Sequence, residues 1–247
     1  MEHRDRLWPG GYTFLYDDGL FRPSTDTFLL GAFPRLRRGM TVCELGAGTG
    51  LLSLLLLARE PELTVTGVEL QPQACALFRR TAEENGLQGR MHCLEGDLRQ
   101  GLLPPGRFRL AVANPPYFPP DAGAVAPDAA RRTARAETDC TLAQLCAAAA
   151  RALTWGGSFC LVHRPDRLAD VLEELRRVRL EPKRLRFVHH TAAARPSLFL
   201  LEARLGGGVL WIAKAIPPAA WAGLGIAVLV FLTVWSVRFF WRAAVKL

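Results

Sequence analysis

The stretch CELGAGTG, residues 43–50, ends a short apolar run with three alternating glycines. Glycine allows a tight turn and lets backbone N–H groups approach a ligand at the start of the next helix. The spacing is GxGxG and Leu51 follows, so the GxGxxG fingerprint of dinucleotide-binding loops is not met. The stretch predicts a strand, a ligand-binding loop and a helix in succession; ordinary turn glycines are the alternative.

Apolar runs alternate with helix-like segments on both sides of this loop. Strands are expected at 41–45, 64–70, 91–95, 109–113, 158–163, 184–190 and 197–204, and helices at 51–59, 71–85, 140–154 and 166–179, with a weaker case at 98–103. This alternation is typical of βαβ units and a parallel sheet. Only TAAARP separates the last two strands, so they must form an antiparallel hairpin. We predict an α/β, Rossmann-like fold with seven strands.

The composition divides the 247-residue chain into a polar, turn-rich segment 1–24, an α/β domain 25–208 and a hydrophobic tail 209–247. The net charge is +8, of which the tail supplies +4, so the domain has only a modest bias toward polyanions. The six cysteines include no CxxC pair, which favours buried thiols over zinc ligands or disulfides. The N-terminus lacks a signal peptide's apolar run, which indicates a cytoplasmic body.

Two acidic residues follow the next strands at the edge of the sheet where the glycine loop lies. Glu69 ends the second strand in GVEL, and Asp97 follows the third in LEGDL. Ligands of open α/β sheets bind outside the carboxyl ends of the strands, and a carboxylate there can accept hydrogen bonds from ribose hydroxyls. The alternative for either acid alone is a helix N-cap.

The fourth strand ends in LAVANPPYF, residues 110–118. Its two prolines cannot continue a hydrogen-bonded ladder, so the strand must stop there. The strand then gives way to a rigid turn that carries an amide, Asn114, and an aromatic ring, Tyr117. An ordinary strand-ending turn is the alternative.

ELGAGTG, VEL, GDL and NPPY, in this order on a seven-strand plan, resemble the class I S-adenosylmethionine-dependent methyltransferases. The resemblance covers roughly residues 10–205. It implies S-adenosylmethionine as cofactor, with the glycine loop beside its methionine part, Glu69 on its ribose and Asp97 near its adenine. The implied cofactor residues are Glu44, Gly46, Ala47, Gly48, Gly50, Glu69, Leu70, Asp97, Leu98 and Asn114.

In this family NPPY implies a catalytic role for Asn114, Pro115, Pro116 and Tyr117. The exocyclic amine of a nucleic-acid base is a poor nucleophile because its lone pair is delocalised into the ring of the base. The Asn114 side-chain oxygen and the Pro115 carbonyl can accept its two hydrogens and stabilise the charge that develops during transfer. Tyr117 can stack on the base.

The segment FRPSTDTFLLGAF, residues 21–33, is similar to the start of the bacterial enzymes that methylate adenine N6 beside the anticodon of valine tRNA. In those enzymes it closes over the cofactor, so residues 1–24 become a capping segment and Thr25 and Asp26 pocket residues; helix N-capping is the alternative. ARAE, 134–137, echoes the same group. Valine tRNA is the implied substrate.

Basic residues follow the NPPY turn, and Arg131, Arg132 and Arg135 are expected to bind RNA. A second cluster comprises Arg176, Arg177, Arg179, Lys183, Arg184 and Arg186, for which a solvated helix face is the alternative. His189 and His190 lack a metal-ligand spacing, and no metal is predicted.

The tail does not fit the resemblance. Residues 215–237 hold 23 uncharged, largely apolar residues, enough to cross a bilayer, and a membrane helix is predicted at about 217–237. The basic residues beyond it oppose the positive-inside rule. A shifted reading frame or assembly error, and a segment packed on the domain or at a membrane interface, are the alternatives.

Two other functions remain open. A protein glutamine-N5 methyltransferase acting on a release factor or ribosomal protein also uses NPPY, but such enzymes carry a long helical N-terminal domain, whereas about 40 residues precede the glycine loop here. A catalytically silent RNA-binding module is the third.

Overall fold

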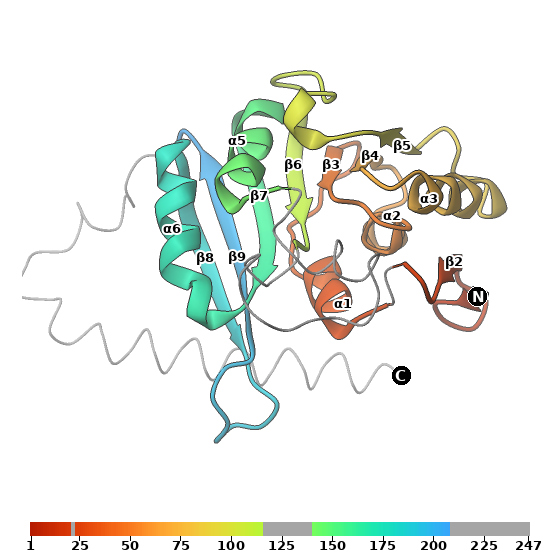
Figure 1. The fold of residues 1–247 in the computed structure, drawn as a ribbon, viewed down its shortest axis with the longest axis horizontal. Helices are drawn as coiled ribbons and strands as arrows, with labels where there is room; N and C mark the ends of the chain where they lie inside the picture. The colour runs from red at the N-terminus through yellow and green to blue at the C-terminus, as the bar shows by residue number, and fades with distance from the viewer. Residues whose placement is uncertain (21–22, 116–139, 208–247) are drawn as a thin grey trace, which may run out of the picture. The chain divides into compact units, whose positions relative to one another are not determined.

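A central β-sheet organises the computed structural model, which describes residues 1–20, 23–115 and 140–207 (Figure 1). Its strands are β3 (Thr41–Leu45), β4 (Thr64–Glu69), β5 (Met91–Glu95), β6 (Phe108–Ala113), β7 (Leu153–His163), β8 (Leu180–Val188) and β9 (Leu198–Leu205). Their order across the sheet is β5-β4-β3-β6-β7-β9-β8. β3 to β7 run parallel, and β9 pairs antiparallel with both β7 and β8. The predicted seven-stranded sheet with a terminal hairpin is confirmed.

Helices cover both faces of the sheet. They are α1 (Thr25–Ala32), α2 (Leu51–Arg59), α3 (Pro72–Glu84), α5 (Leu142–Ala152) and α6 (Leu168–Arg177), with single 3-10 turns η1 (Leu98–Gln100) and η2 (Pro165–Arg167). Alternate residues of β6 show the two layers: Leu110 and Val112 pack with α1, α2 and α3, whereas Ala111 and Ala113 pack with α5 and α6. A strand buried on both faces reads as a continuous apolar run, which is why LAVA, residues 110–113, was recognisable in the sequence.

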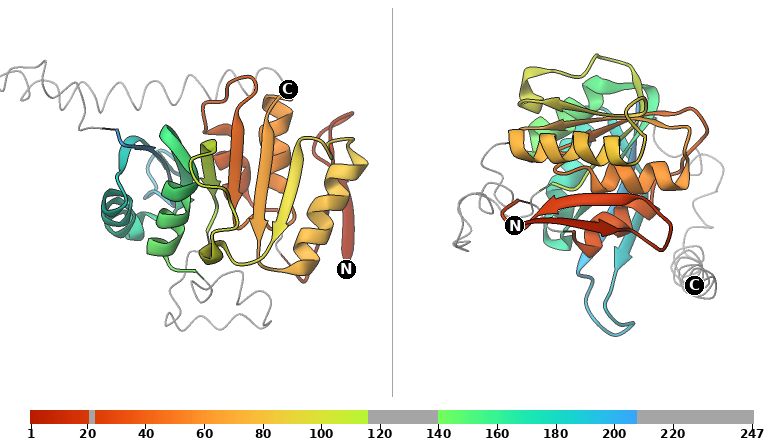
Figure 2. Two further views of the ribbon diagram at one scale, coloured as in Figure 1. Left: turned by 90° about the horizontal axis from the view of Figure 1, so that it is seen from above. Right: turned by 90° about the vertical axis from the view of Figure 1, so that its right-hand side faces the viewer.

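The N-terminal segment forms a hairpin that the sequence did not predict. β1 (Glu2–Arg6) pairs antiparallel with β2 (Thr13–Asp17). Asn85, at the end of α3, accepts from the Thr13 N–H at 2.8 Å and donates to the Thr13 carbonyl at 2.7 Å. Phe14 of β2 is buried in the core, so the hairpin is anchored beside α3 (Figure 2).

Element boundaries mostly agree with the sequence, but several predictions were wrong in extent. The strands expected to begin at 158 and 184 begin at Leu153 and Leu180. β7 begins at Leu153, so the helix expected to reach 154 ends at Ala152. The helix considered at 98–103 is the single turn η1, followed by Gly101 at φ 68°. A residue with positive φ ends a helix, and glycine adopts that conformation without steric cost.

The cysteine prediction was wrong for one pair. Cys75 of α3 and Cys93 of β5 form a disulfide, with their Cα atoms 6.0 Å apart. Packing of the helix on the strand brings the two side chains together, which a spacing of 18 residues does not reveal. Cys43, Cys146 and Cys160 are buried thiols, as expected, whereas Cys140 is only half-buried.

The chain divides into a unit ending at Gly207 and a second unit from Gly208 onward. The predicted membrane helix at 217–237 lies outside the described residues. Within the parts that the structure describes, no helix is long and apolar enough to cross a bilayer.

A glycine inside β4 permits the glycine loop to pack on the sheet, and its substitution should displace that loop. A Cβ at Gly67 would lie 2.6 Å from the Ala47 Cβ and 2.9 Å from the Phe78 ring. We expect Gly67→Ala to lower the free energy of unfolding by about 1–3 kcal/mol, the usual cost of overpacking. Denaturant unfolding measures it.

Gly89→Ala is the matched control, because a Cβ there has no atom within 4 Å. Equal stability of the two variants would show that the close approach of Ala47 to Gly67 is not tight.

Candidate active site

The glycine loop is fixed against β4. The N–H groups of Gly46 and Ala47 both donate to the Val68 carbonyl at 3.0 Å. Gly46, Gly48 and Gly50 have φ of 71°, 53° and 89°, the left-handed region that favours glycine. The loop therefore turns at all three predicted positions and leads directly into α2.

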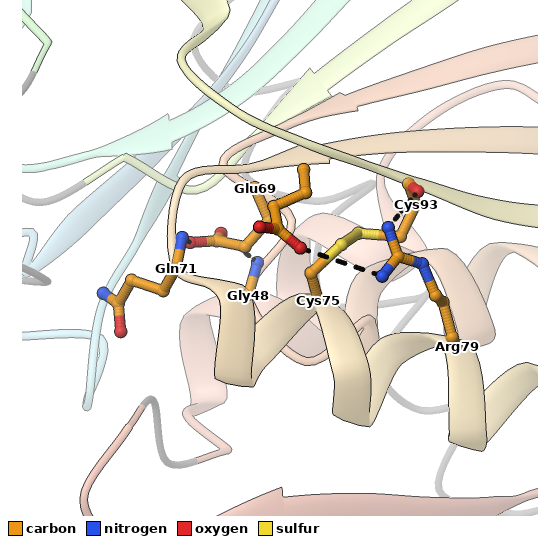
Figure 3. The surroundings of a disulfide bond; sticks show 7 residues. Gly48, Glu69, Gln71, Cys75, Arg79 and Cys93 are labelled. Atoms are coloured by element: carbon orange, nitrogen blue, oxygen red, sulfur yellow. Dashed lines mark hydrogen bonds and ion pairs between the residues drawn. A yellow bond between two sulfur atoms is a disulfide. The ribbon is translucent and has the colours of Figure 1, made fainter.

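Glu69 links this loop to the end of β4. Its carboxylate accepts from the Gly48 N–H at 2.7 Å and from the Gln71 N–H at 2.9 Å (Figure 3). Burial raises the pKa of the Glu69 carboxyl, and the backbone N–H donors oppose that shift. The side chain is 8% exposed at the carboxyl edge of the sheet, where it was predicted to bind ribose.

Glu44 contacts the start of α2, and its expected place in the cofactor site remains a prediction. Its carboxyl accepts from the Ser53 backbone N–H at 3.0 Å and from the Ser53 hydroxyl. Ser53 lies in the first turn of α2, whose N–H groups have no partner within the helix. Burial raises the pKa of Glu44 to about 8, against the effect of these hydrogen bonds. Glu44 thus ties the start of α2 to the end of β3.

Two features of the loop fit the cofactor that the sequence predicted. A Cβ at Gly46 would meet no atom within 4 Å, so the turn faces open space. Thr49 Oγ1 is buried and has no hydrogen-bond partner among the described residues. A polar ligand at this loop can satisfy that hydroxyl, because buried polar groups normally have partners. The residues present therefore fit a polar group such as the methionine part of S-adenosylmethionine.

Asp97 has the helix-capping role that was the alternative to cofactor binding in the sequence analysis. It is the N-cap of η1 and accepts from the Arg99 N–H at 2.8 Å. Its carboxylate also pairs with the Arg99 guanidinium, which lowers the pKa of Asp97. Its expected contact with adenine remains a prediction.

Leu98, a predicted cofactor residue, lines an open cavity of about 410 Å³ between the 98–103 segment and α5, together with Leu103, Gln144 and Ala148.

Leu70, the predicted cofactor residue after Glu69, is 42% exposed, so its side chain is accessible at the surface.

Asn114 lies where β6 ends and contacts α1. Its Nδ2 donates to Thr27 Oγ1 at 3.0 Å across 87 residues of sequence. Thr27 is 3% exposed, and its contact brings α1 to the predicted catalytic turn. The N-cap of α1 is Ser24, so Thr25 and Asp26 lie in its first turn and are not the cap. Asn114 and Pro115 are both half-buried.

Several predicted residues lie outside the described residues: Pro116, Tyr117, Arg131, Arg132 and Arg135. Of the second basic cluster, Arg177 pairs with Glu173 and Glu174, and Arg176 pairs with Glu181 at 3.6 Å. Paired charges on a helix are typical of a solvated face. Arg184 instead donates to the Phe33 carbonyl at 2.7 Å, at the end of α1.

Sequence reasoning missed Thr27, Thr49 and Gly67. Thr27, Leu30 and Gly31 are the buried positions of α1, at the i, i+3, i+4 spacing of one helix face. That spacing was readable once α1 was taken to start at Thr25. Thr49 and Gly67 carried no comparable signal, because their roles depend on the packing of the loop against β4.

Comparison with known proteins defines the class. Residues 23–181 match the methyltransferase small domain family, and the chain belongs to it. A solved structure described as a predicted O-methyltransferase of Agrobacterium tumefaciens shares the fold, with a TM-score of 0.61 and 20% identity over 74% of this chain and 82% of that one. The protein is a methyltransferase, and its cofactor is S-adenosylmethionine.

The relatives narrow the family. The chain is 32% identical over 182 residues to a tRNA1(Val) (adenine(37)-N6)-methyltransferase of Yersinia enterocolitica, covering 71% of each chain. It is 33% identical over 160 residues to the protein of the same name from Yersinia pestis, covering 62% of this chain and 64% of that one. The chain belongs to the family of these bacterial valine-tRNA adenine-N6 methyltransferases.

Removal of the Glu69 carboxylate should weaken cofactor binding. We expect Glu69→Ala to raise the Kd for S-adenosylmethionine at least about tenfold, since a lost hydrogen bond to a charged group costs about 1.5–3 kcal/mol. Isothermal titration calorimetry measures the Kd.

Glu95→Ala is the control for this change, because Glu95 ends the neighbouring strand β5 but its side chain is 45% exposed and pairs only loosely with Arg79, at 3.8 Å. An unchanged Kd for Glu69→Ala would remove Glu69 from the cofactor site.

His163, at the end of β7, should make the fold sensitive to acid. Its Nδ1 accepts from the Arg164 N–H at 2.8 Å, so Nδ1 carries no proton. Burial lowers the pKa of His163 from 6.5 to about 4. The unfolded chain binds this proton more readily, so this contribution to stability is present above pH 6.5 and is lost as pH falls toward 4. The pH dependence of urea unfolding measures it.

His163→Asn keeps an acceptor near the position of Nδ1 and should flatten the slope between pH 6.5 and 4. His92→Asn, at an exposed position of β5, should leave the slope unchanged. Equal slopes in all three proteins would contradict the assignment.

Proposed function

We propose that this protein transfers a methyl group from S-adenosylmethionine to the N6 amine of an adenine in tRNA, next to the anticodon of valine tRNA. The observation that carries the proposal is the position of Asn114, at the carboxyl edge of the sheet that also holds the glycine loop and Glu69. The named activity of the Yersinia relatives supports the choice of substrate.

The proposed chemistry needs acceptors and no strong base. The cofactor supplies an electrophilic methyl group on a sulfonium. Asn114 Oδ1 and the Pro115 carbonyl accept the two hydrogens of the adenine amine, so the lone pair of the amine is less delocalised as the bond forms. This stabilises positive charge that develops on nitrogen in the transition state. The extra proton can leave after transfer.

The other predicted residues complete the proposal. Pro116 stiffens the turn, and Tyr117 stacks on the base, a contact worth about 1–3 kcal/mol per base. The base must leave its stack to reach the site, as is usual for enzymes that act on a base. Arg131, Arg132 and Arg135 bind RNA phosphates. Thr25, Asp26, Asp97 and Leu70 contribute to the cofactor pocket.

The proposed place of action follows from the reactants. tRNA and S-adenosylmethionine are cytoplasmic, so the unit 1–207 acts in the cytoplasm. A membrane contact through 217–237 would leave the chemistry unaltered, because the sheet closes with β9. Cell fractionation with a probe for the C-terminus tests that contact.

The substrate class can be tested directly. Protein incubated with methyl-labelled S-adenosylmethionine should label valine tRNA at adenine N6. Label on a release factor instead would favour the glutamine methyltransferase, and cofactor binding with no label on either would favour the silent module.

Asn114→Ala should reduce transfer and spare cofactor binding. We expect kcat to fall at least ~10²-fold, the scale of losing one oriented polar group at a transition state. Single-turnover methylation of valine tRNA measures the loss, and calorimetry with S-adenosylmethionine is the control. Wild-type turnover in this variant would remove Asn114 from the mechanism.

A further inference from the structure

A primary amide such as that of Asn114 has two ends of similar size and opposite hydrogen-bonding character. Its Oδ1 accepts and its Nδ2 donates. The proposed chemistry needs the oxygen to face the amine, because a donor there would repel the amine hydrogens. Something in the protein must therefore fix which end points toward the substrate.

The contact that can do so comes from α1. Asn114 Nδ2 donates to Thr27 Oγ1 at 3.0 Å. Thr27 Oγ1 also lies 3.4 Å from Ser24 Oγ. When the Thr27 hydroxyl gives its proton to Ser24, its lone pairs point toward Asn114 and select the donor end of the amide. Thr27 is 3% exposed, so water does not compete strongly for this hydroxyl.

The helix that carries Thr27 is itself held in place. Arg59 of α2 donates to the carbonyls of Gly31 and Pro34 at 2.5 and 3.0 Å. Arg184 of β8 donates to the Phe33 carbonyl at 2.7 Å, and its guanidinium carbon lies 3.9 Å from the centre of the Phe33 ring. These bonds satisfy carbonyls at the end of α1, where partners within the helix are missing.

Close packing removes the remaining freedom of α1. A Cβ at Gly31 would lie 3.0 Å from Leu55 of α2, so the two helices meet with little space between them. Leu30 of α1 is fully buried. Thr27 therefore projects from a fixed support, which is the condition for orienting another side chain.

We propose that Thr27 is a positioning residue, which sets the orientation of the Asn114 amide so that Oδ1 faces the methyl-accepting nitrogen. It acts through Asn114 alone. This inference rests on the proposed function for its kinetic consequence, but the orientation of the amide is a property of the protein without substrate.

The kinetic test replaces the hydroxyl by a group of the same shape. Thr27→Val should lower kcat for valine tRNA about 10- to 100-fold and leave the Kd for S-adenosylmethionine within about twofold. Thr27→Ser, which keeps the hydroxyl, should recover most of kcat. Thr41→Val is the matched control, because Thr41 Oγ1 donates to the Arg107 carbonyl at 2.9 Å at the opposite end of β3. That variant should retain wild-type kcat.

A double-mutant cycle separates positioning from general damage. With Asn114→Ala already present, Thr27→Val should cause no further loss of kcat, because no amide remains to be oriented. Losses that multiply would show that Thr27 acts independently of Asn114, and wild-type kcat in Thr27→Val would show that the hydroxyl is dispensable. Either result overturns the proposal.

A measurement without substrate keeps this inference distinct from the proposed function. In protein labelled with ¹⁵N-asparagine, Thr27→Val should shift the Asn114 side-chain NH₂ resonances, assigned by their loss in Asn114→Ala, and bring their hydrogen exchange closer to that of exposed amides. Unchanged resonances overturn the positioning role even if the enzyme methylates tRNA. If wild-type protein labels no tRNA but these resonances shift, the proposed function fails and the orienting contact stands.

Discussion

The parallel pairing of β3 with β6 is the constraint on which the site depends. Cys43 lies opposite Ala111, and Glu44 lies opposite Val112, so the two strands end at the same edge. The chain leaves β3 toward one side of the sheet and reaches β6 only after building β4 and β5. This switch point is where open α/β sheets bind ligands, because the loops on either side diverge. It places the glycine loop beside Asn114.

The edge is built around carboxyl groups that the protein buries. Glu44 and Glu69 are 4% and 8% exposed, and burial raises the pKa of both. Glu44 accepts from the N–H and hydroxyl of Ser53 in the first turn of α2, and Glu69 accepts from the N–H groups of Gly48 and Gln71 in the loops after β3 and β4. A buried acceptor without such donors would be costly. Because each buried carboxyl group requires these donors, it also fixes the positions of the segments that provide them.

The sequence was sufficient for the sheet because its signals are local. Alternating apolar runs, three glycines after β3 and the prolines after β6 specify strands and their ends within a few residues. The β1–β2 hairpin was not predicted because β1, EHRDR, is wholly polar and contributes no buried residue, so the short apolar run of β2 had no recognisable partner strand. The disulfide between Cys75 and Cys93 was not predicted, because their pairing is set by how α3 packs on the sheet. The same limit applies to the contact of Asn114 with Thr27, because the two residues lie 87 positions apart in the sequence.

The contact of Thr27 with Asn114 also explains why α1, which precedes the sheet in the chain, must be part of the domain. An amide at the end of a strand is free to turn about its last bond unless a neighbour distinguishes its two ends. The hydroxyl of Thr27 makes that distinction, and it comes from α1 rather than from the sheet that carries Asn114. The proposed transfer to a planar amine needs an acceptor that already points toward the amine hydrogens. A helix fixed by Arg59 and Arg184 supplies direction without adding a charge to the reaction centre.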